Sequence, residues 1–199
     1  MTLLLKNILL SLSLIIASIS SPLAANESAP MEQVRGTIDH ILTTLKDDSI
    51  SKQEKRKVII DRISQSFDFT GMSQRALATN WRKANPQQKK DFTELFQQLI
   101  QNTYIGRLEA YTDEKVRYLK SKTKGRKAII KTMIVTKSAD IPIKYKLIQK
   151  NGNWLVYDVE IEKISLISNY RSTYQSLIKK NGFDGLLATM RDKVNELNP

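Results

Sequence analysis

Residues 153–159 read NWLVYDV, residues 164–171 read ISLISNYR, and residues 182–186 read GFDGL. The first run is rich in β-branched and aromatic residues and predicts a final strand. The second run begins a helical pattern, and Asn181-Gly182 predicts the end of that helix. Leu187, Met190, Val194 and Leu197 then share one helical face. The C-terminal third is therefore predicted to fold as a strand, a turn and two closing helices.

The segment before this stretch, from Lys115 to Ile161, has a period of two and many β-branched residues. Asn151-Gly152 is a strong hairpin signal between two such runs. The segment 120–127 contains Gly125 and five basic residues and is predicted as a hairpin tip. Because the strands follow one another without intervening helices, the sheet should be antiparallel. The predicted strands are residues 116–119, 128–136, 141–147 and 154–161.

The N-terminal half has apolar residues at three- and four-residue steps, which predict helices. Ser51 and Glu54 form a capping-box pattern before the second helix. Thr70 is predicted to cap a short third helix that reaches Trp81. Asn85-Pro86 predicts the start of the longest helix, with Asn as cap and Pro in the first turn.

The predicted fold class is therefore α+β. A curved antiparallel sheet of four strands, with a fifth possible, packs against several helices and leaves an apolar cavity between sheet and helices. Helices are expected over residues 31–111, the sheet over 115–161 and the closing helices over 166–197.

The first 25 residues have the pattern of a signal peptide. Lys6 precedes an apolar stretch, and small residues before Asn26 favour cleavage after Ala25. An uncleaved membrane anchor is the alternative, although Lys6 and Asn7 interrupt the apolar segment early. Residues 26–199 would then form one domain. The chain contains no cysteine, which excludes a lipid-modified cysteine, a disulfide and thiol chemistry.

The charge balance is strongly basic, with a formal net charge of +12 that becomes +11 without Lys6. Such a chain in an exported compartment attracts phospholipid head groups and acidic proteins, whereas export argues against nucleic acid. Two basic clusters are candidates for docking on an acidic partner or a membrane rim; a merely solvated surface is the alternative for each. The clusters are Lys120, Lys122, Lys124, Arg126 and Lys127, and Arg82, Lys83, Lys89 and Lys90.

Few residues suggest catalysis or metal binding. His40 is the single histidine, no Gly-x-Ser-x-Gly elbow accompanies it, and no cysteine or second histidine completes a zinc site. Asp158 lies within an apolar strand and is the one candidate general base, as in ketosteroid-isomerase-like enzymes. The structural alternative is that Asp158 points out of the sheet or pairs with a neighbouring strand or with Arg171. We expect no catalytic residue and no metal site.

With this organisation, the chain resembles the MlaC-type periplasmic phospholipid carriers, also called toluene-tolerance or ABC-transporter auxiliary proteins. The similarity extends from about Met31 to Leu197, and the segment from Tyr111 to Arg126 departs from the family pattern. The matching residues are Phe67-Asp68-Phe69, Met72, Ala76, Leu77, Trp81-Arg82, Ala84, Phe92, Phe96, Leu99, Tyr104, Asn153-Trp154, Val156-Tyr157-Asp158-Val159, Ile164-Ser165-Leu166-Ile167, Asn169-Tyr170-Arg171 and Gly182-Phe183-Asp184-Gly185-Leu186.

The resemblance implies a soluble, monomeric shuttle with phospholipid as cargo and no cofactor. Its implied partners are an outer-membrane lipoprotein–porin complex and an inner-membrane ABC transporter with a substrate-binding ring subunit. Its implied role is to maintain outer-membrane lipid asymmetry. An enzyme that uses Asp158 and a basic periplasmic protein-binding adaptor remain as alternatives.

Twelve apolar or aromatic residues are candidates for the lipid pocket, and each of them could instead belong to an ordinary core. They are Phe69, Phe92, Phe96, Leu99, Tyr104, Ile143, Tyr145, Leu147, Trp154, Val156, Leu166 and Tyr170.

Overall fold

The computed structural model describes residues 29–110 and 115–197, so the predicted signal peptide lies outside the described residues. The helices are α1 (Ala29–Lys46), α2 (Lys52–Ser66), α3 (Phe69–Leu77), α4 (Thr79–Lys83), α5 (Pro86–Glu109) and α6 (Leu166–Leu197). The strands are β1 (Lys115–Lys124), β2 (Lys127–Val135), β3 (Asp140–Lys150), β4 (Asn153–Ile161) and β5 (Ile164–Ser165).

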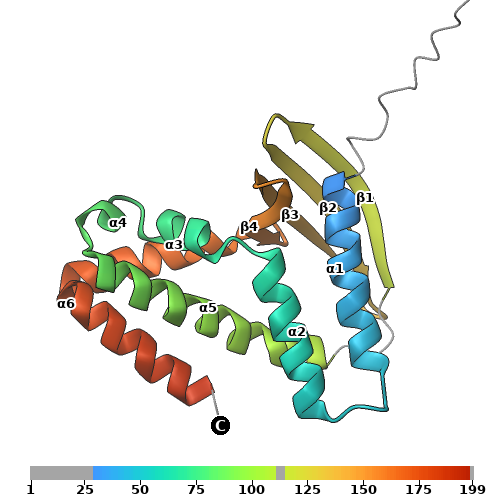
Figure 1. The fold of residues 1–199 in the computed structure, drawn as a ribbon, viewed down its shortest axis with the longest axis horizontal. Helices are drawn as coiled ribbons and strands as arrows, with labels where there is room; N and C mark the ends of the chain where they lie inside the picture. The colour runs from blue at the N-terminus through green and yellow to red at the C-terminus, as the bar shows by residue number, and fades with distance from the viewer. Residues whose placement is uncertain (1–28, 111–114, 198–199) are drawn as a thin grey trace, which may run out of the picture.

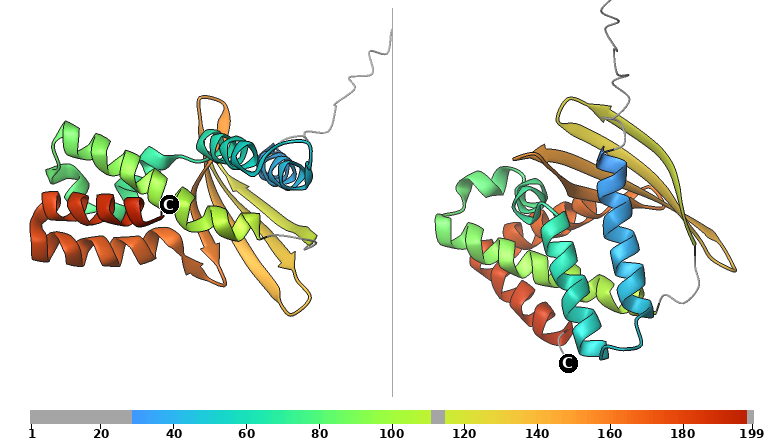
Figure 2. Two further views of the ribbon diagram at one scale, coloured as in Figure 1. Left: turned by 90° about the horizontal axis from the view of Figure 1, so that it is seen from below. Right: turned by 45° about the vertical axis from the view of Figure 1, so that its right-hand side comes forward.

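The five strands form one antiparallel sheet in the order β1-β2-β3-β4-β5. Helix α1 lies across one face of this sheet, and α3 to α6 form a helical layer beside it (Figure 1). Figure 2 shows that α1 and α2 lie on the same side of the sheet. The prediction of an α+β fold with an antiparallel sheet is confirmed, and the possible fifth strand is β5.

Local capping signals place the helix starts. Ser51 and Glu54 form a reciprocal capping box at the start of α2, as the sequence predicts. Asn85 does the same with Gln88 at α5, where Pro86 occupies the first turn. The prediction that Thr70 caps the third helix is wrong, because Asp68 provides the cap and accepts a hydrogen bond from the Gly71 amide at 3.0 Å.

Two interruptions of the helices occur at residues with positive φ. At Ala78, φ is +50°, so the predicted helix to Trp81 is divided into α3 and the short α4. Gly182 has a φ of +70°, a conformation that glycine adopts without steric penalty. It divides α6 into the two predicted closing helices, which run side by side in opposite directions (Figure 2).

The hairpins follow the sequence signals only in part. Asn151 and Gly152 have φ values of +49° and +82°, as the Asn-Gly signal between β3 and β4 predicts. The prediction that residues 120–127 form a hairpin tip is wrong. Strand β1 continues to Lys124, and only Gly125 and Arg126 separate it from β2. Extended pairing continues because the period-two pattern persists through the lysines, which occupy one face of the sheet.

The inner face of the sheet, which faces α1, is apolar. Alternate residues of β2 and β3 are buried against Val34 of α1, so the predicted one-sided pattern of β3 is observed. The sheet core consists of Val34, Ala128, Ile130, Ile143, Leu147, Trp154, Val156 and Val159. Register shifts lie between Tyr118 and Lys120 in β1 and at the pairing of Leu147 with Val156, and such bulges increase the local twist of a sheet.

A second core lies within the helical layer. It consists of Phe69, Met72, Ala76, Leu77, Phe92, Phe96, Ile100, Ile167, Tyr174, Leu186, Leu187 and Met190. Phe67 is half-buried and packs against both this helical core and the sheet core. Its neighbour Asp68 donates a backbone hydrogen bond to the Val156 carbonyl at 2.8 Å. The segment between α2 and α3 therefore joins the helices to the sheet.

Asp68 has little room to move. Only 6% of it is exposed, and its Oδ2 lies 2.7 Å from the Lys150 amino group. A Cβ atom at Gly71 would lie 2.0 Å from that Oδ2 and 2.6 Å from the Asp68 Cγ. Gly71 is thus required for the Asp68 cap by the close approach of the two residues.

Gly71→Ala should lower the free energy of unfolding by about 2 kcal/mol, because the added methyl group displaces the Asp68 cap and its contact with Lys150. Urea denaturation monitored by circular dichroism measures the change. Gly106→Ala is the matched control. No atom lies within 4 Å of a Cβ at this helical position, so the substitution should raise the free energy of unfolding by about 1 kcal/mol. Equal losses for both variants would contradict the steric explanation.

Candidate functional site

Six of the twelve predicted pocket residues lie in or beside the helical core. Phe69, Phe92 and Phe96 are buried there, Leu99 is buried on α5, and Tyr104 and Tyr170 pack partly buried against the core. Phe92 and Phe96 stack with ring centroids 5.5 Å apart, and Tyr170 meets Phe96 edge to face at 5.2 Å. Such aromatic pairs stabilise a packed interior beyond the burial of their area.

The tyrosines of this aromatic group remain neutral in the physiological pH range. Burial raises the pKa of Tyr174, and the neighbouring Tyr170 hydroxyl adds to this effect. Burial also raises the pKa of Tyr170 and of Tyr104. The apolar interior of the helical layer therefore gains no negative charge from these phenols.

The other six predicted residues lie in or beside the sheet core. Ile143, Leu147, Trp154 and Val156 are buried, while Tyr145 and Leu166 pack against them with part of their surface exposed. Burial raises the pKa of Tyr145 to about 12, so this residue also remains neutral at pH 7. All six side chains face the same apolar layer under α1.

The structure thus brings the twelve residues into two groups that meet at Phe67. Most of these side chains are buried. Two hollows on the described part of the chain measure about 480 and 360 Å³, and none of the twelve residues lines either of these two. Which of the twelve residues contact a ligand therefore stays a prediction.

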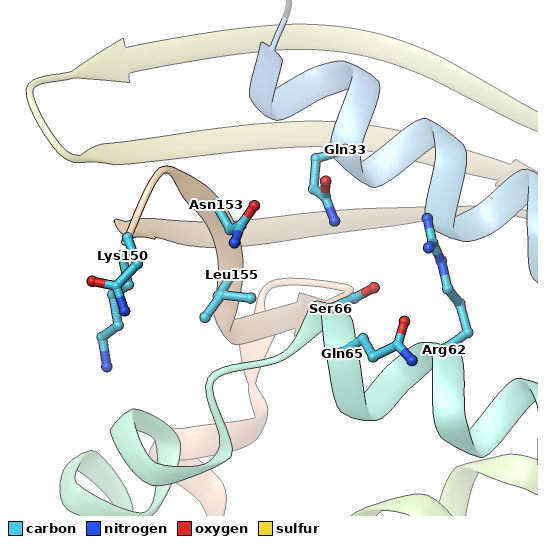
Figure 3. A pocket seen from close by; sticks show the side chains of 8 residues that line it. Gln33, Arg62, Gln65, Ser66, Lys150, Asn153 and Leu155 are labelled. Carbon is cyan, nitrogen blue, oxygen red and sulfur yellow. The ribbon is translucent and has the colours of Figure 1, made fainter.

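The larger hollow, here called the polar hollow, lies between α1, α2 and the β3–β4 turn (Figure 3). Its walls are mostly polar and come from segments far apart in the sequence. They are Gln33, Arg62, Gln65, Ser66, Lys150, Asn151, Asn153 and Leu155. This site has no recognisable pattern in the sequence, because its polar residues come from α1, α2 and the β3–β4 hairpin, which lie far apart along the chain.

Asp158, the candidate general base, has a structural environment. It is 5% exposed, and its carboxylate accepts hydrogen bonds from the Ser165 hydroxyl at 2.9 and 3.0 Å. The Ile167 amide donates to the same carboxylate at 3.3 Å, and Lys146 of the neighbouring strand lies 2.9 Å away. Asp158 thereby anchors the start of α6. It pairs with the neighbouring strand and not with Arg171, whose side chain donates to the Arg75 carbonyl.

Lys146 belongs to a small ionic network on the outer face of the sheet. It also contacts Glu160 at 2.5 Å, and Lys144 contacts Glu160 from the same strand. Burial disfavours the charged lysine, but hydrogen bonds to Glu160 and Asp158 raise the pKa of Lys146 overall. Burial also opposes the charge of Glu160, yet hydrogen bonds from both lysines lower the pKa of this carboxyl. These groups are therefore charged at pH 7.

The remaining candidates for chemistry are dispersed. His40 is exposed on α1. Among residues 29–110 and 115–197, no three histidine, cysteine or carboxylate residues are grouped as metal ligands. Over the same residues, no helix is long and apolar enough to cross a membrane.

The first basic cluster continues as a face of the β1–β2 ribbon. Lys120 lies opposite Lys131, and Lys124 lies opposite Lys127. Like charges in such positions repel one another. In the part of the chain that the structure describes, none of the lysines at positions 120, 122, 124, 127 and 131 forms an ion pair. Leu119 and Ile129, which are 48% and 37% exposed, lie among them.

Comparison with solved structures finds the same fold in a phospholipid-binding protein from Ralstonia solanacearum that was determined in complex with a phospholipid. The TM-score is 0.77 and the sequence identity is 22%, and the match covers 84% of this chain and 98% of that chain. The α+β architecture of the present chain is therefore that of a known phospholipid-binding protein.

Two curated proteins show sequence similarity over most of the chain. The intermembrane phospholipid transport system binding protein MlaC of Haemophilus influenzae is 20% identical over 183 residues, which cover 87% of this chain and 86% of the relative. The toluene tolerance protein ttg2D of Pseudomonas putida is 25% identical over 162 residues, which cover 78% and 75% respectively. A family model described as MlaC protein matches residues 35–192, and the chain therefore belongs to the MlaC family.

Proposed function

We propose that the protein is a soluble phospholipid carrier. The acyl chains of the bound phospholipid would lie between the sheet core and the helical core. The observation that carries this proposal is the continuous apolar layer that extends from the inner face of the sheet, through Phe67, to the aromatic group of α5 and α6. Membership of the MlaC family and the phospholipid in the Ralstonia structure support the same reading.

The energetics of a lipid in water favour an enclosed site. Each methylene that leaves water is stabilised by about 0.8 kcal/mol. Two chains of roughly 15 methylenes would therefore be destabilised by about 24 kcal/mol if they were exposed. A membrane buries the same surface, so the carrier needs only a nearly balanced affinity. The direction of lipid transport would then be set by the partners of the carrier or by ATP hydrolysis elsewhere.

Because most of the candidate side chains are buried, we infer that the apolar layer opens to accept a lipid. Helix α1 covers the sheet core and is tied to β1 at its edge. The Tyr118 hydroxyl donates to Asp39 at 2.9 Å, and the Arg35 guanidinium lies 3.8 Å from the Tyr118 ring centroid. These contacts are largely exposed, so separation of α1 from β1 would leave few buried polar groups unpaired.

The proposed setting is the periplasm, which the protein would reach through cleavage of the signal peptide at residues 1–25. The proposed partners are an outer-membrane lipoprotein–porin complex and an inner-membrane ABC transporter with a substrate-binding ring subunit. The monomeric carrier would move phospholipid between them and so maintain outer-membrane lipid asymmetry. No cofactor or catalytic step enters this proposal, because the interactions of Asp158 favour its structural role over general-base catalysis.

The proposal predicts that the exported protein, purified without detergent, contains about one phospholipid per chain. Mass spectrometry of an organic extract, with total phosphorus measured against protein, tests this. Protein from which the lipid was extracted, and which was then refolded and mixed with the same cell lipids, should again bind about one phospholipid per chain. Preparations free of lipid after both treatments would contradict the carrier proposal and favour a protein-binding adaptor.

The basic face of the β1–β2 ribbon should accelerate lipid transfer to anionic membranes. Replacement of Lys120, Lys122, Lys124 and Lys127 with glutamine should slow transfer to phosphatidylglycerol vesicles several-fold at low salt, and the difference should shrink at high salt. Arg126 is kept because it hydrogen-bonds to the Gln149 carbonyl. Fluorescent-lipid dequenching measures the rate.

The matched control replaces four exposed lysines elsewhere, namely Lys46, Lys57, Lys179 and Lys180, and has the same net charge. Its transfer rate should stay closer to that of the unaltered protein. Equal rates for the two quadruple variants would show that only net charge matters. Both variants should keep their bound lipid.

A further inference from the structure

Arg62 in the polar hollow is a cation without an anionic partner. In residues 29–110 and 115–197 its guanidinium forms no ion pair, and its Nε is enclosed without a hydrogen-bond partner. The side chain extends from α2 toward α1 (Figure 3). The Arg62 Nη2 lies beside Gly36 of α1, where an added Cβ would be 3.8 Å away, an ordinary van der Waals distance. The charge of Arg62 is therefore not neutralised by another residue that the structure describes.

Other donors converge on the same space. The side-chain amides of Gln33, Gln65 and Asn153 line the hollow and make no side-chain hydrogen bond to another described residue. No carboxylate lines it, and the charge of nearby Lys150 is paired with Asp68. An arginine with amide donors and no acid is a chemical setting for a phosphate group, to which guanidinium binds through two parallel hydrogen bonds.

The polar hollow is also continuous along the chain with the sheet core. On the helical walls, a residue that lines the hollow is followed by one that packs in or against the apolar core. These pairs are Gln33 with Val34 and Ser66 with Phe67. A ligand that reaches across this boundary must have an anionic end and an apolar end.

We propose that the polar hollow binds the phosphate group of a glycerophospholipid, with Arg62 as its main ligand and Gln33, Gln65 and Asn153 as additional donors. This assignment rests on the proposed carrier function and specifies where the head group lies. The acyl chains then enter the sheet core beside Phe67 and Trp154. Recognition through the phosphate would allow binding of any diacyl phospholipid whose head group leaves the phosphate accessible.

The test measures binding to the delipidated full-length mature protein by calorimetry. The probes are dihexanoyl phosphatidylglycerol and dihexanoylglycerol below their aggregation concentrations, and inorganic phosphate. The variants are Arg62→Gln, which removes the charge, and Gln65→Glu, which places a negative charge at an exposed position. Arg82→Gln on α4 is the control, because it removes an exposed arginine far from the hollow in sequence and fold.

Arg62→Gln should weaken binding of the phosphatidylglycerol about tenfold, which corresponds to loss of one charge-assisted hydrogen-bonding group. Gln65→Glu should also weaken it, whereas Arg82→Gln should not. Dihexanoylglycerol, which lacks the phosphate, should bind Arg62→Gln and the unaltered protein equally. Thermal unfolding checks that each variant is folded, and Gln65→Glu carries the test alone if Arg62→Gln is unstable.

Unchanged phosphatidylglycerol affinity in both hollow variants would overturn the assignment. If inorganic phosphate binds and only its binding depends on Arg62, the hollow serves a free anion and the lipid assignment is overturned. An unaltered protein that binds neither short-chain lipid would overturn the carrier function itself, which is a separate result.

Discussion

The backbone hydrogen bond from Asp68 to Val156 joins the two layers of the molecule. It places the segment between α2 and α3 beside β4, at the part of the strand that β5 does not cover. Asp68 then caps α3 with its side chain and contacts Lys150 at the end of β3. Because these interactions share one buried residue, the helical layer, the sheet and the β3–β4 turn keep a fixed relation at this point.

The same junction lies between the two apolar cores. Phe67 packs against both cores, so an apolar ligand beside it can reach either group of candidate residues. Asp158 anchors α6 to the sheet, since its buried carboxylate accepts hydrogen bonds from the Ser165 hydroxyl and the Ile167 amide. Helix α1 has mainly exposed polar contacts with β1. If the proposed lipid displaces α1, the hydrogen bonds that anchor α6 would remain, because none of them involves α1.

Much of the fold could be predicted because local signals agreed with the final packing. The Ser51 and Asn85 caps, the Asn151-Gly152 turn and the Gly182 break each depend on residues within one turn of the chain. Both Asp68 and Thr70 are residues that can cap a helix, so the sequence does not decide between them. In the structure Asp68 is the cap, because Gly71 leaves room for its side chain. The β1–β2 tip was misplaced because a run of lysines resembles a loop in composition.

The candidate site was less predictable for a physical reason. Apolar residues that line a ligand and apolar residues that fill a core have the same sequence pattern, so the twelve candidates were found as one set and lie in two cores. The polar hollow depends on Arg62 and Asn153 meeting across 91 positions of sequence, and only the fold brings them together. Asp158 was recognised as unusual, but its partners Lys146, Ser165 and Ile167 became evident only in the structure.

The most direct test of where the lipid lies is photo-crosslinking with a phospholipid that carries a diazirine near the end of one acyl chain. Mass spectrometry of the digested protein then identifies the labelled residues. A lipid between the two cores should label the inner face of the sheet and the facing helices, at residues such as Ile143, Val156 or Phe69. Labels confined to Leu119 and Ile129 on the outer face would contradict it, because the lipid would then lie on the surface of the protein.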